Sequence, residues 1–245
     1  MRIQRAFHPE SDGTAHVVVI HPPGGCVGGD QLSIEARVQE SASALLTTPG
    51  AGKVYRTNGH GVSVVTVLHV GPRAVLEYVP QEMVVYEDAD ARLLTRVVLE
   101  AEAQFLGWEV VCLGRPAAGE GFDEGSLRLD FSVHAGGAPI FVERGQVAGG
   151  SELAHASWGL QGYAAFGTMV ATVDALVEAR AALAEHGKRD VAAAATELST
   201  AQGPLLVVRA LGPDGTRVRG VLEAVRHRVR DRWGRPRIDP AIWRS

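Results

Sequence analysis

The feature that most constrains the fold of this chain is a long succession of short segments in which apolar and polar residues alternate. Gly, Pro, Asn or Asp residues separate these segments. Alternation with a period of two is typical of β-strands with one buried face, and the separating residues are typical of turns. The predicted strands cover residues 14–20, 31–38, 44–48, 62–70, 74–79, 93–99, 105–113, 127–134 and 139–147. The first two thirds of the chain is therefore predicted to be mainly β, with stacked sheets.

The strand pattern alone leaves the type of β architecture open. A sandwich, a barrel and an irregular β-helix each bury one face of every strand, and no strict internal repeat distinguishes them. At 245 residues, the chain has the length of one large all-β domain or of two smaller ones, and no shift in composition divides it.

The last third of the chain changes to a helical period. Apolar residues recur at helical spacing over residues 173–186, where Thr172 is positioned to cap the start and Gly187 to end the helix. A second helix is predicted over residues 218–233, with an apolar stripe along one face. Between the two helices, residues 205–211 have the composition of a strand.

The other face of the second helix is strongly basic. It carries Arg219, Arg226, Arg228, Arg230 and Arg232. A basic face of this kind is more often a solvated surface than a nucleic-acid groove, and no aromatic residues are interleaved with it for base stacking. We therefore interpret it as an exposed face that is open to a protein contact.

Charge and cysteine content narrow the cellular context. The net charge of −4 gives no reason to expect nucleic acid or a membrane as a partner. The N-terminus lacks the apolar core of a signal peptide, and no later run reaches membrane-spanning length. The two cysteines, Cys26 and Cys112, are too few for a disulfide framework and lack zinc-site spacing, which favours free thiols. We expect a cytoplasmic protein.

A search for enzyme motifs leaves one catalytic hypothesis. Residues 49–54 look like the end of a phosphate-binding loop, but Thr47 stands where the first glycine should be and Val54 where Ser or Thr should be. Neither Gly-x-Ser-x-Gly nor His-Glu-x-x-His occurs, and the nine histidines lack metal-ligand spacing. What remains is a cysteine-dependent hydrolase that uses Cys26 as the nucleophile and His21 as its base.

A ten-residue loop, HPPGGCVGGD at residues 21–30, joins two of the predicted strands. Its two prolines fix φ and its four glycines allow positive φ or a close backbone approach, so the shape of the loop is specified. The loop ends on Asp30. The simplest interpretation is a structural turn in which the Asp30 carboxylate caps its own backbone.

Four carboxylates lie within or beside apolar strands: Glu77, Glu82, Glu109 and Glu143. For any one of them, the default expectation is a side chain that faces solvent. Several together suggest an acidic internal cavity, in which water, a cation or an arginine offsets the cost of desolvation. Arg115 and Arg144 are the candidate partners.

Several motifs resemble the urease accessory protein UreD family, also called UreH. They are HPPGGCVGGD at residues 21–30, LLTTPGAGKVYR at 45–56, YVPQE at 78–82, FLGWEVVCLGRP at 105–116, VER at 142–144 and a closing Pro-x-Ile-Trp-like tail. Each motif is weak alone. Because they follow the family's order along nearly the whole chain, the set of motifs is specific.

The resemblance implies a single UreD-like domain over residues 1–245. Its fold would be an irregular β-helix-like stack of sheets with two α-helices in the C-terminal third. Its function would be that of a non-enzymatic chaperone that binds the urease apoprotein and UreF, and through UreF the GTPase UreG. No tightly bound cofactor is implied, but Ni²⁺ would pass transiently through the interior on its way to urease.

The resemblance also assigns the nickel path. The acidic positions inside family members match Asp30 in the GGD motif, Glu109 in GWE and Glu143 in VER, with Arg115 in LGRP beside them. These three carboxylates would form the transient metal path. Arg115 would be their charge partner, limiting their repulsion so that they stay ionised near neutral pH.

Overall fold

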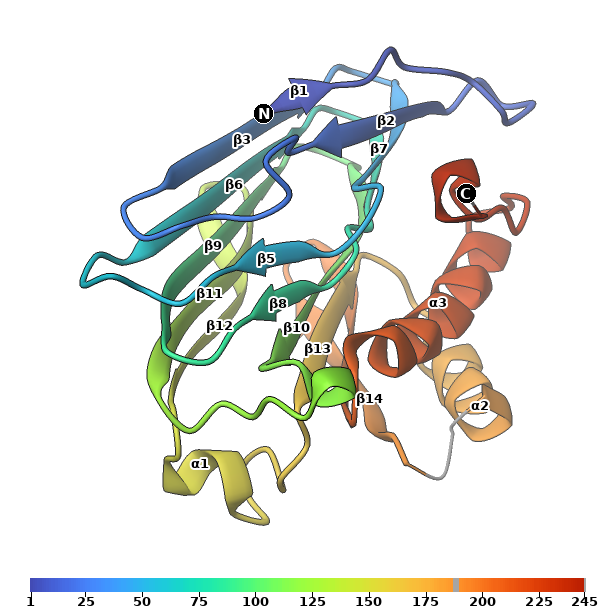
Figure 1. The fold of residues 1–245 in the computed structure, drawn as a ribbon. Helices are drawn as coiled ribbons and strands as arrows, with labels where there is room; N and C mark the ends of the chain where they lie inside the picture. Colours follow the sequence, from blue (N-terminus) through green and yellow to red (C-terminus); the bar gives the residue numbers. More distant parts are fainter. Residues whose placement is uncertain (187–189, 245) are drawn as a thin grey trace.

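The computed structural model describes residues 1–186 and 190–244. Two β-sheets lie face to face, and two helices cover the far side of the larger sheet (Figure 1). The larger sheet contains ten strands: β1 (Arg2–Ile3), β2 (Ala15–Ile20), β4 (Ser43–Thr47), β5 (Gly52–Val54), β7 (Val75–Tyr78), β8 (Met83–Val85), β10 (Gln104–Leu113), β13 (Ala165–Ala171), β14 (Ala192–Thr200) and β15 (Gly203–Gly212). The smaller sheet contains five: β3 (Gln31–Val38), β6 (Val62–Val70), β9 (Ala89–Leu99), β11 (Gly125–Ala135) and β12 (Ala138–Ala148).

The chain winds as a β-solenoid of about three turns. It crosses repeatedly between the sheets, so β2, β4, β7 and β10 stack in parallel in one sheet and β3, β6, β9 and β11 in the other. The chain then reverses, and β12, β13, β15 and β14 join by antiparallel pairing. The predicted mainly β fold is confirmed, and the solenoid selects the irregular β-helix from the three architectures that the strand pattern left open.

Burial on one or both faces explains the sequences of the strands. In β6, Val62, Val64, Leu68 and Val70 pack between the sheets and alternate with less buried residues. Their mostly β-branched side chains suit a half-buried extended backbone. By contrast, β10 reads as a nearly continuous apolar run, because it has the helices on one side and the smaller sheet on the other.

Within residues 1–186 and 190–244, three hydrophobic cores hold these layers together. Two lie between the sheets, and the third lies between the larger sheet and the helices. Trp108 is fully buried in the third core, where its indole N–H donates a hydrogen bond to the Pro80 carbonyl at 2.8 Å. The apolar stripe predicted for the second helix is entirely buried: Val218, Val221, Leu222, Val225 and Val229.

The first predicted helix is confirmed, but it starts later than expected. It is α2 (Leu176–His186). Thr172 does not cap it; the Thr172 hydroxyl oxygen instead accepts a hydrogen bond from the backbone N–H of Phe105 at 2.8 Å. Thr172 follows β13, which pairs with β10, so sheet pairing determines its partner. The predicted helix end at Gly187 lies outside the described residues.

The second predicted helix is α3 (Gly215–Arg232), and a carboxylate caps its start. The Asp214 side chain accepts a hydrogen bond from the backbone N–H of Arg217 at 2.8 Å. The part of the chain that the structure describes also contains three shorter helical segments: η1 (Pro116–Ala118), α1 (Glu152–His155) and η2 (Ala241–Arg244). Within the described ranges, no helix has both the length and the apolar character needed to cross a membrane.

The basic face of α3 is not the solvated surface that its sequence indicates. Arg226 and Arg230 are fully buried, and both bind the Glu77 carboxylate, Arg226 through Nε at 2.6 Å. Arg230 also binds Glu10, whose other carboxylate oxygen lies 2.7 Å from Nε2 of His16. The prediction is wrong for these two arginines because helical periodicity does not reveal that the sheet beneath the helix presents a carboxylate to them.

Candidate functional site

Two cavities lie within the solenoid and meet at one carboxylate. The first has a volume of about 260 Å³, and its lining includes His21, Cys26, Thr66, Tyr78, Met83 and Thr95. The second has a volume of about 250 Å³, and its lining includes Leu129, Phe131, Glu143, Leu153, Phe166 and Arg209. Two residues of β10, Glu109 and Val111, belong to both linings. The two cavities therefore adjoin at Glu109.

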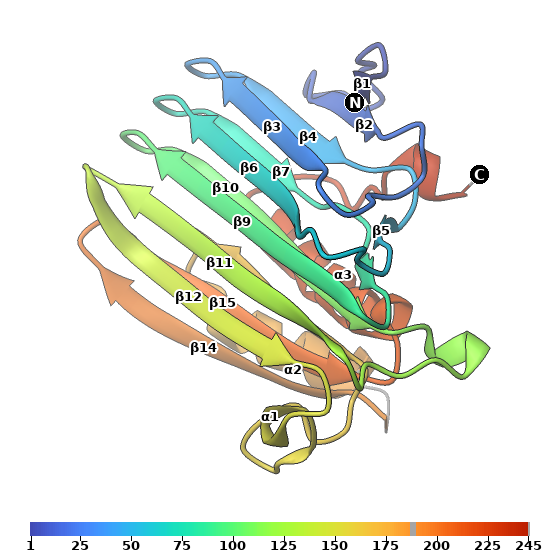
Figure 2. The same ribbon diagram turned by 60° about the vertical axis from the view of Figure 1, so that its left-hand side comes forward.

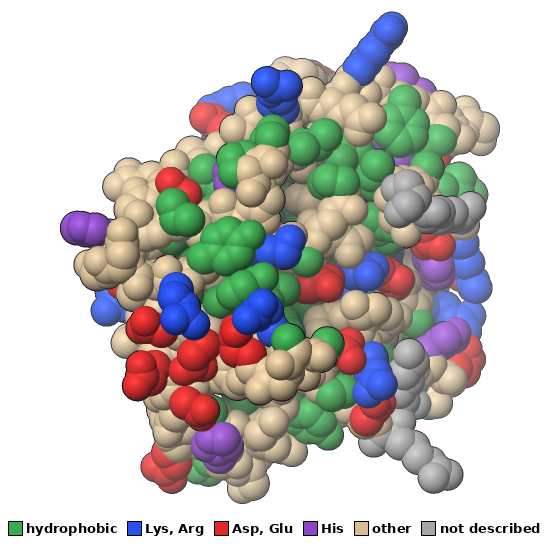
Figure 3. All heavy atoms as spheres, in the orientation of Figure 1, with side chains coloured by type: hydrophobic (Ala, Val, Ile, Leu, Met, Phe, Trp, Pro, Cys, Tyr) green, Lys and Arg blue, Asp and Glu red, His purple; other side chains and the backbone are tan. Residues whose placement is uncertain are grey.

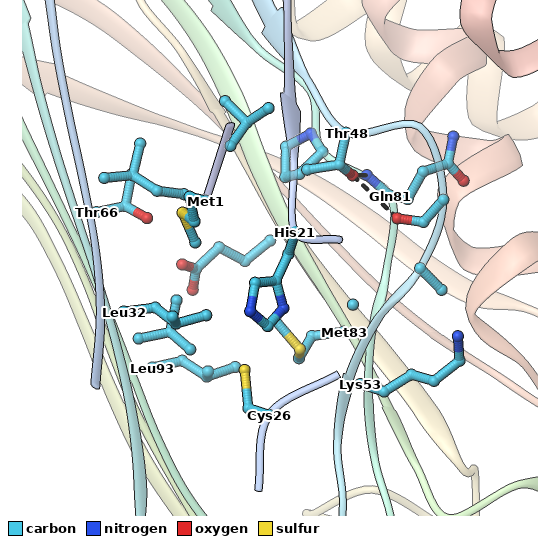
Figure 4. A pocket seen from close by; sticks show the side chains of 18 of the residues that line it. Met1, His21, Cys26, Leu32, Thr48, Lys53, Thr66, Gln81, Met83 and Leu93 are labelled. Carbon is cyan, nitrogen blue, oxygen red and sulfur yellow. Dashed lines mark hydrogen bonds between the residues drawn. The ribbon is translucent and has the colours of Figure 1, made fainter. Parts of the chain in front are cut away.

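Side chains from many parts of the chain line the first cavity (Figure 4). His21 and Cys26 come from the glycine-rich loop, Leu32 comes from β3 of the smaller sheet, and Met83 comes from β8 of the larger sheet. Figure 4 shows the side chains of His21, Cys26 and Met83 around the same cavity. The glycine-rich loop thus forms one wall of this cavity.

Strand alternation explains why Glu109 lies inside the molecule. Trp108 and Val110, its neighbours on β10, face the helices, so Glu109 faces the smaller sheet. There its Oε1 accepts a hydrogen bond from the Thr95 hydroxyl on β9. The default expectation of a solvent-facing side chain is therefore wrong for this carboxylate.

Burial raises the pKa of Glu109 to about 7. The hydrogen bond from Thr95 opposes this shift, and the negative charges of Glu143 and Asp130 add to it. The side chain keeps some accessible surface because it faces both cavities. Near neutral pH this carboxyl group is close to half protonated, whereas the sequence led us to expect a fully ionised group.

Tyr78 lines the first cavity together with Glu109. Burial raises the pKa of the Tyr78 phenol well above its ordinary value, the nearby Glu109 charge raises it further, and a hydrogen bond with Thr66 opposes the shift. The phenol is therefore neutral at physiological pH. The first cavity thus brings hydroxyl and carboxyl oxygens together in a mostly apolar space.

Glu143 lies on β12 and lines the second cavity. Its Oε1 accepts a hydrogen bond from Nε of Arg209 at 2.6 Å, and 31% of its side chain is exposed, so it lies where the cavity approaches solvent. Arg209 is not among the charge partners that the sequence pattern predicts. The only signal for it was a lone arginine within the predicted strand 205–211.

Asp30 has the structural role that the loop sequence suggested. Its Oδ2 accepts a hydrogen bond from the backbone N–H of Val27 at 2.9 Å, which closes the end of the loop. Its side chain belongs to neither lining, but its charge acts on Cys26, which lines the first cavity. The structure therefore brings Glu109 and Glu143 to a shared pair of cavities and leaves Asp30 beside the first one.

Arg115 has a different partner from the one expected. Its Nε donates a hydrogen bond to Oε2 of Glu120 at 3.0 Å, and its guanidinium lies 4.6 Å from the centre of the Tyr86 ring. This pair is on the outer surface around the loop between β10 and β11, a region where Figure 3 shows many acidic side chains. The expectation of Arg115 as charge partner is corrected: the arginine that neutralises Glu143 is Arg209.

The environment of Cys26 argues against a thiol nucleophile. Burial, and secondarily the charge of Asp30, raise the pKa of the Cys26 thiol to about 11. Only a minute fraction would be thiolate at neutral pH, although His21 lines the same cavity. Over the part of the chain that the structure describes, no three His, Cys, Asp or Glu side chains are grouped closely enough to hold a metal ion tightly.

Comparison with known proteins identifies relatives over the whole length of the chain. The family model described as UreD urease accessory protein matches residues 1–244. The urease accessory protein UreD of Janthinobacterium sp. (strain Marseille) is 37% identical over 254 residues, which cover 100% of this chain and 83% of that protein. The urease accessory protein UreD of Dechloromonas aromatica (strain RCB) is 36% identical over 255 residues, covering 100% of this chain and 86% of that protein.

A third relative is more similar over a shorter span. The urease accessory protein UreD of Azoarcus sp. (strain BH72) is 41% identical over 214 residues, covering 86% of this chain and 73% of that protein. The matches to the first two relatives and to the family model include both cavities, the glycine-rich loop and α3.

Proposed function

From the premise that this chain belongs to the UreD family of urease accessory proteins, we propose that it conducts nickel through its two cavities to the urease apoprotein. Family membership makes it a non-enzymatic chaperone of urease maturation. In the proposed complex it binds the urease apoprotein and UreF, and UreF brings UreG. The chain acts in the cytoplasm and as one UreD-like domain. The single domain is supported by the larger sheet, which includes strands from both ends of the chain.

The observation that carries the nickel proposal is the position of Glu109. A carboxylate that lines two adjoining cavities can receive a cation from one and release it to the other. Glu143, in the second cavity, offers the next oxygen ligands, and Asp30 contributes negative charge beside the first. We therefore keep all three carboxylates as the transient nickel path, with Arg209 rather than Arg115 as charge partner.

The chemistry of these ligands suits a metal ion in transit. Carboxylate oxygens and water bind Ni²⁺ less tightly than a closed set of Cys and His ligands would, so the ion dissociates readily. Because the pKa of Glu109 is about 7, protonation competes with the metal and weakens binding further near neutral pH. Both effects favour passage over storage.

We expect the triple variant Asp30→Asn, Glu109→Gln, Glu143→Gln to lower the nickel content of co-expressed urease. Amides keep the size of the side chains and the acceptor that Asp30 offers to Val27, so the loop and the fold should persist. The measurements are the nickel content and activity of purified urease, together with recovery of the complex containing UreF and apo-urease. Urease activity should fall with nickel content while the complex still assembles.

The matched control neutralises three carboxylates on the surface: Glu35→Gln, Glu40→Gln and Asp231→Asn. Each pairs with an exposed arginine, and none belongs to either cavity lining. The control replaces the same number of carboxyl groups by amides and should leave nickel loading unchanged. Fully nickel-loaded urease from the cavity variant would refute the conduit, and loss of the complex would show that these carboxylates are structural.

Replacing Cys26 by Ala should leave urease activation intact. The hydrolase hypothesis, with His21 as the base, requires the thiol, whereas the nickel path requires oxygen ligands. Ala fits the buried position with the loss of a single sulfur atom. Urease activity after co-expression with Cys26→Ala is the measurement, and a loss comparable to deletion of the chaperone would revive the hydrolase hypothesis.

A further inference from the structure

The outer face of the smaller sheet is an uncovered surface. The α2 and α3 helices lie on the far side of the larger sheet, and the view in Figure 2 looks onto β3, β6, β9, β11 and β12 with no described element in front of them. Every second residue of these strands packs inward, so the residues between them point outward. The strand register therefore shows which outward-facing residues lie side by side in rows across the strands.

Adjacent rows of this face differ in character. One row places Val67, Arg96, Ser132 and Val142 side by side on β6, β9, β11 and β12. The next row holds Val65, Leu94, Asp130 and Arg144. The row beyond it holds Ser63, Arg92, Arg128 and Gln146. Val142 is 44% exposed, so aliphatic and arginine side chains share one open surface.

Three arginines of this face have no ion pair within the described residues: Arg92, Arg96 and Arg128. Arg92 and Arg128 are both exposed and lie directly opposite each other on parallel strands. Like charges in that position repel each other and destabilise a sheet. Asp90, on the same face, accepts a hydrogen bond from Ser126. An acidic partner would relieve the repulsion between Arg92 and Arg128.

Other arginines of the same sheet show how such charges are usually neutralised. Arg144 pairs with Asp130 across β11 and β12 at 2.8 Å, and Arg37 pairs with Glu35 on β3. The uncompensated positive charge is thus confined to β9 and β11, beside the valines. It occurs in a chain whose net charge is −4, so the positive patch is local rather than a consequence of a basic composition.

We propose that this face, defined by Val65, Val67, Arg92, Arg96, Arg128 and Val142, docks a partner protein whose surface presents carboxylates around a small aliphatic patch. The proposal rests on the proposed function, in which the partner belongs to the urease assembly. A protein fits better than nucleic acid because arginine is enriched at protein interfaces, whose central part is more apolar than the rest of the surface. The three rows contain no Phe, Tyr or Trp on which bases could stack.

The test reverses charge at the central pair with Arg92→Glu and Arg128→Glu. Binding of the purified full chain to cognate UreF and to cognate apo-urease is measured at several salt concentrations. We expect the affinity for one of the two to fall by more than about tenfold, with a weaker dependence on salt, because reversed charges then face the partner's carboxylates. Both arginines are exposed and unpaired, so the variant should fold as the wild type does.

Three further variants complete the design. Arg2→Glu with Arg5→Glu changes the net charge equally at exposed positions near the N-terminus and should bind as the wild type does. Arg92→Lys with Arg128→Lys keeps the charges and should retain most of the affinity. Val142→Asp should weaken binding to the same partner that the charge reversal affects, which tests the aliphatic part of the surface independently.

The outcomes separate this inference from the function on which it rests. Failure of the wild-type chain to bind either protein would count against the proposed function. Wild-type binding with no change in Arg92→Glu, Arg128→Glu would overturn the docking face, as would an equal loss in the Arg2→Glu, Arg5→Glu control. Binding of the wild type to an RNA probe, lost on charge reversal while both protein complexes persist, would also overturn it.

Discussion

Glu77→Gln is expected to lower the free energy of unfolding by about 3–5 kcal/mol. The Glu77 carboxylate binds Arg226 and Arg230, and each of these three side chains is at most 1% exposed. Gln keeps the shape but removes the charge, so two buried guanidinium groups are left with one fully buried carboxylate, that of Glu10. Urea unfolding at neutral pH measures the difference between the variant and the wild type.

The size of this effect follows from what the buried charges connect. Glu10 precedes β2, Glu77 lies on β7, and both arginines lie on α3. Arg226 also donates to the backbone carbonyl of Ile238 at 3.0 Å, so the segment after α3 depends on the same network. Removal of one carboxylate should therefore also speed hydrogen exchange in α3.

Asp231→Asn is the matched control for Glu77→Gln. Asp231 pairs with Arg237 on the surface, where the two side chains are 42% and 48% exposed. Solvent screens such a pair, so its loss should cost less than about 1 kcal/mol. Equal losses of unfolding free energy in Glu77→Gln and Asp231→Asn would show that the buried ion pairs contribute no more to stability than an exposed one.

A double-mutant cycle isolates the interaction between the buried charges. Arg226→Met in the Glu77→Gln background removes one charge of each sign, so the double variant should be more stable than the sum of the two single effects predicts. Strict additivity would show that Glu77 and Arg226 do not interact energetically.

The second large effect concerns pH: we expect Glu109 to lower stability by about 3 kcal/mol as the pH rises from about 4.5 to about 7. Burial raises the pKa of this group from 4.5 to about 7. Below the unfolded value, both states are protonated and the full stability is present. As pH rises through this window, the unfolded chain ionises before the folded one, so the unfolded state is favoured.

Comparison with Glu109→Gln tests this prediction. The amide does not titrate, so the variant should not lose stability for this reason as the pH rises. Relative to the variant, the free energy of unfolding of the wild type should fall by about 3 kcal/mol between about pH 4.5 and about pH 8. In Thr95→Val, the loss of stability should continue to higher pH than in the wild type, because the hydrogen bond from Thr95 lowers the pKa of Glu109. Parallel pH curves for the wild type and Glu109→Gln would contradict the raised pKa.

Much of the fold could be predicted because periodicity reports which residues of an element share a face. The alternation in residues 62–70 predicts β6 with its correct bounds, and the helical stripe from Val218 to Val229 predicts α3. The start of α2 could not be predicted in this way. Thr172 is a good capping residue in isolation, but its hydroxyl bonds to Phe105, a residue far away in sequence.

The candidate site was predictable only in part. Glu109 and Glu143 stood out as carboxylates within apolar strands, and the loop sequence alone predicted that Asp30 caps its own backbone. The charge partner of the cavity carboxylates differs from the expected one: Arg115 lies close to Glu109 in sequence, whereas Arg209 reaches Glu143 from a strand 66 residues further along.

By itself, the sequence determined the mainly β class, the position of most strands, both helices and the family, because these depend on local periodicity and on motifs in a given order. Only the tertiary structure decided that Arg226 and Arg230 are buried against Glu77, and that two cavities adjoin at Glu109. The physical reason is the same in both cases. An amphipathic pattern shows which face of an element is polar, but the partner of that face comes from another element, and its identity determines burial, charge and pKa.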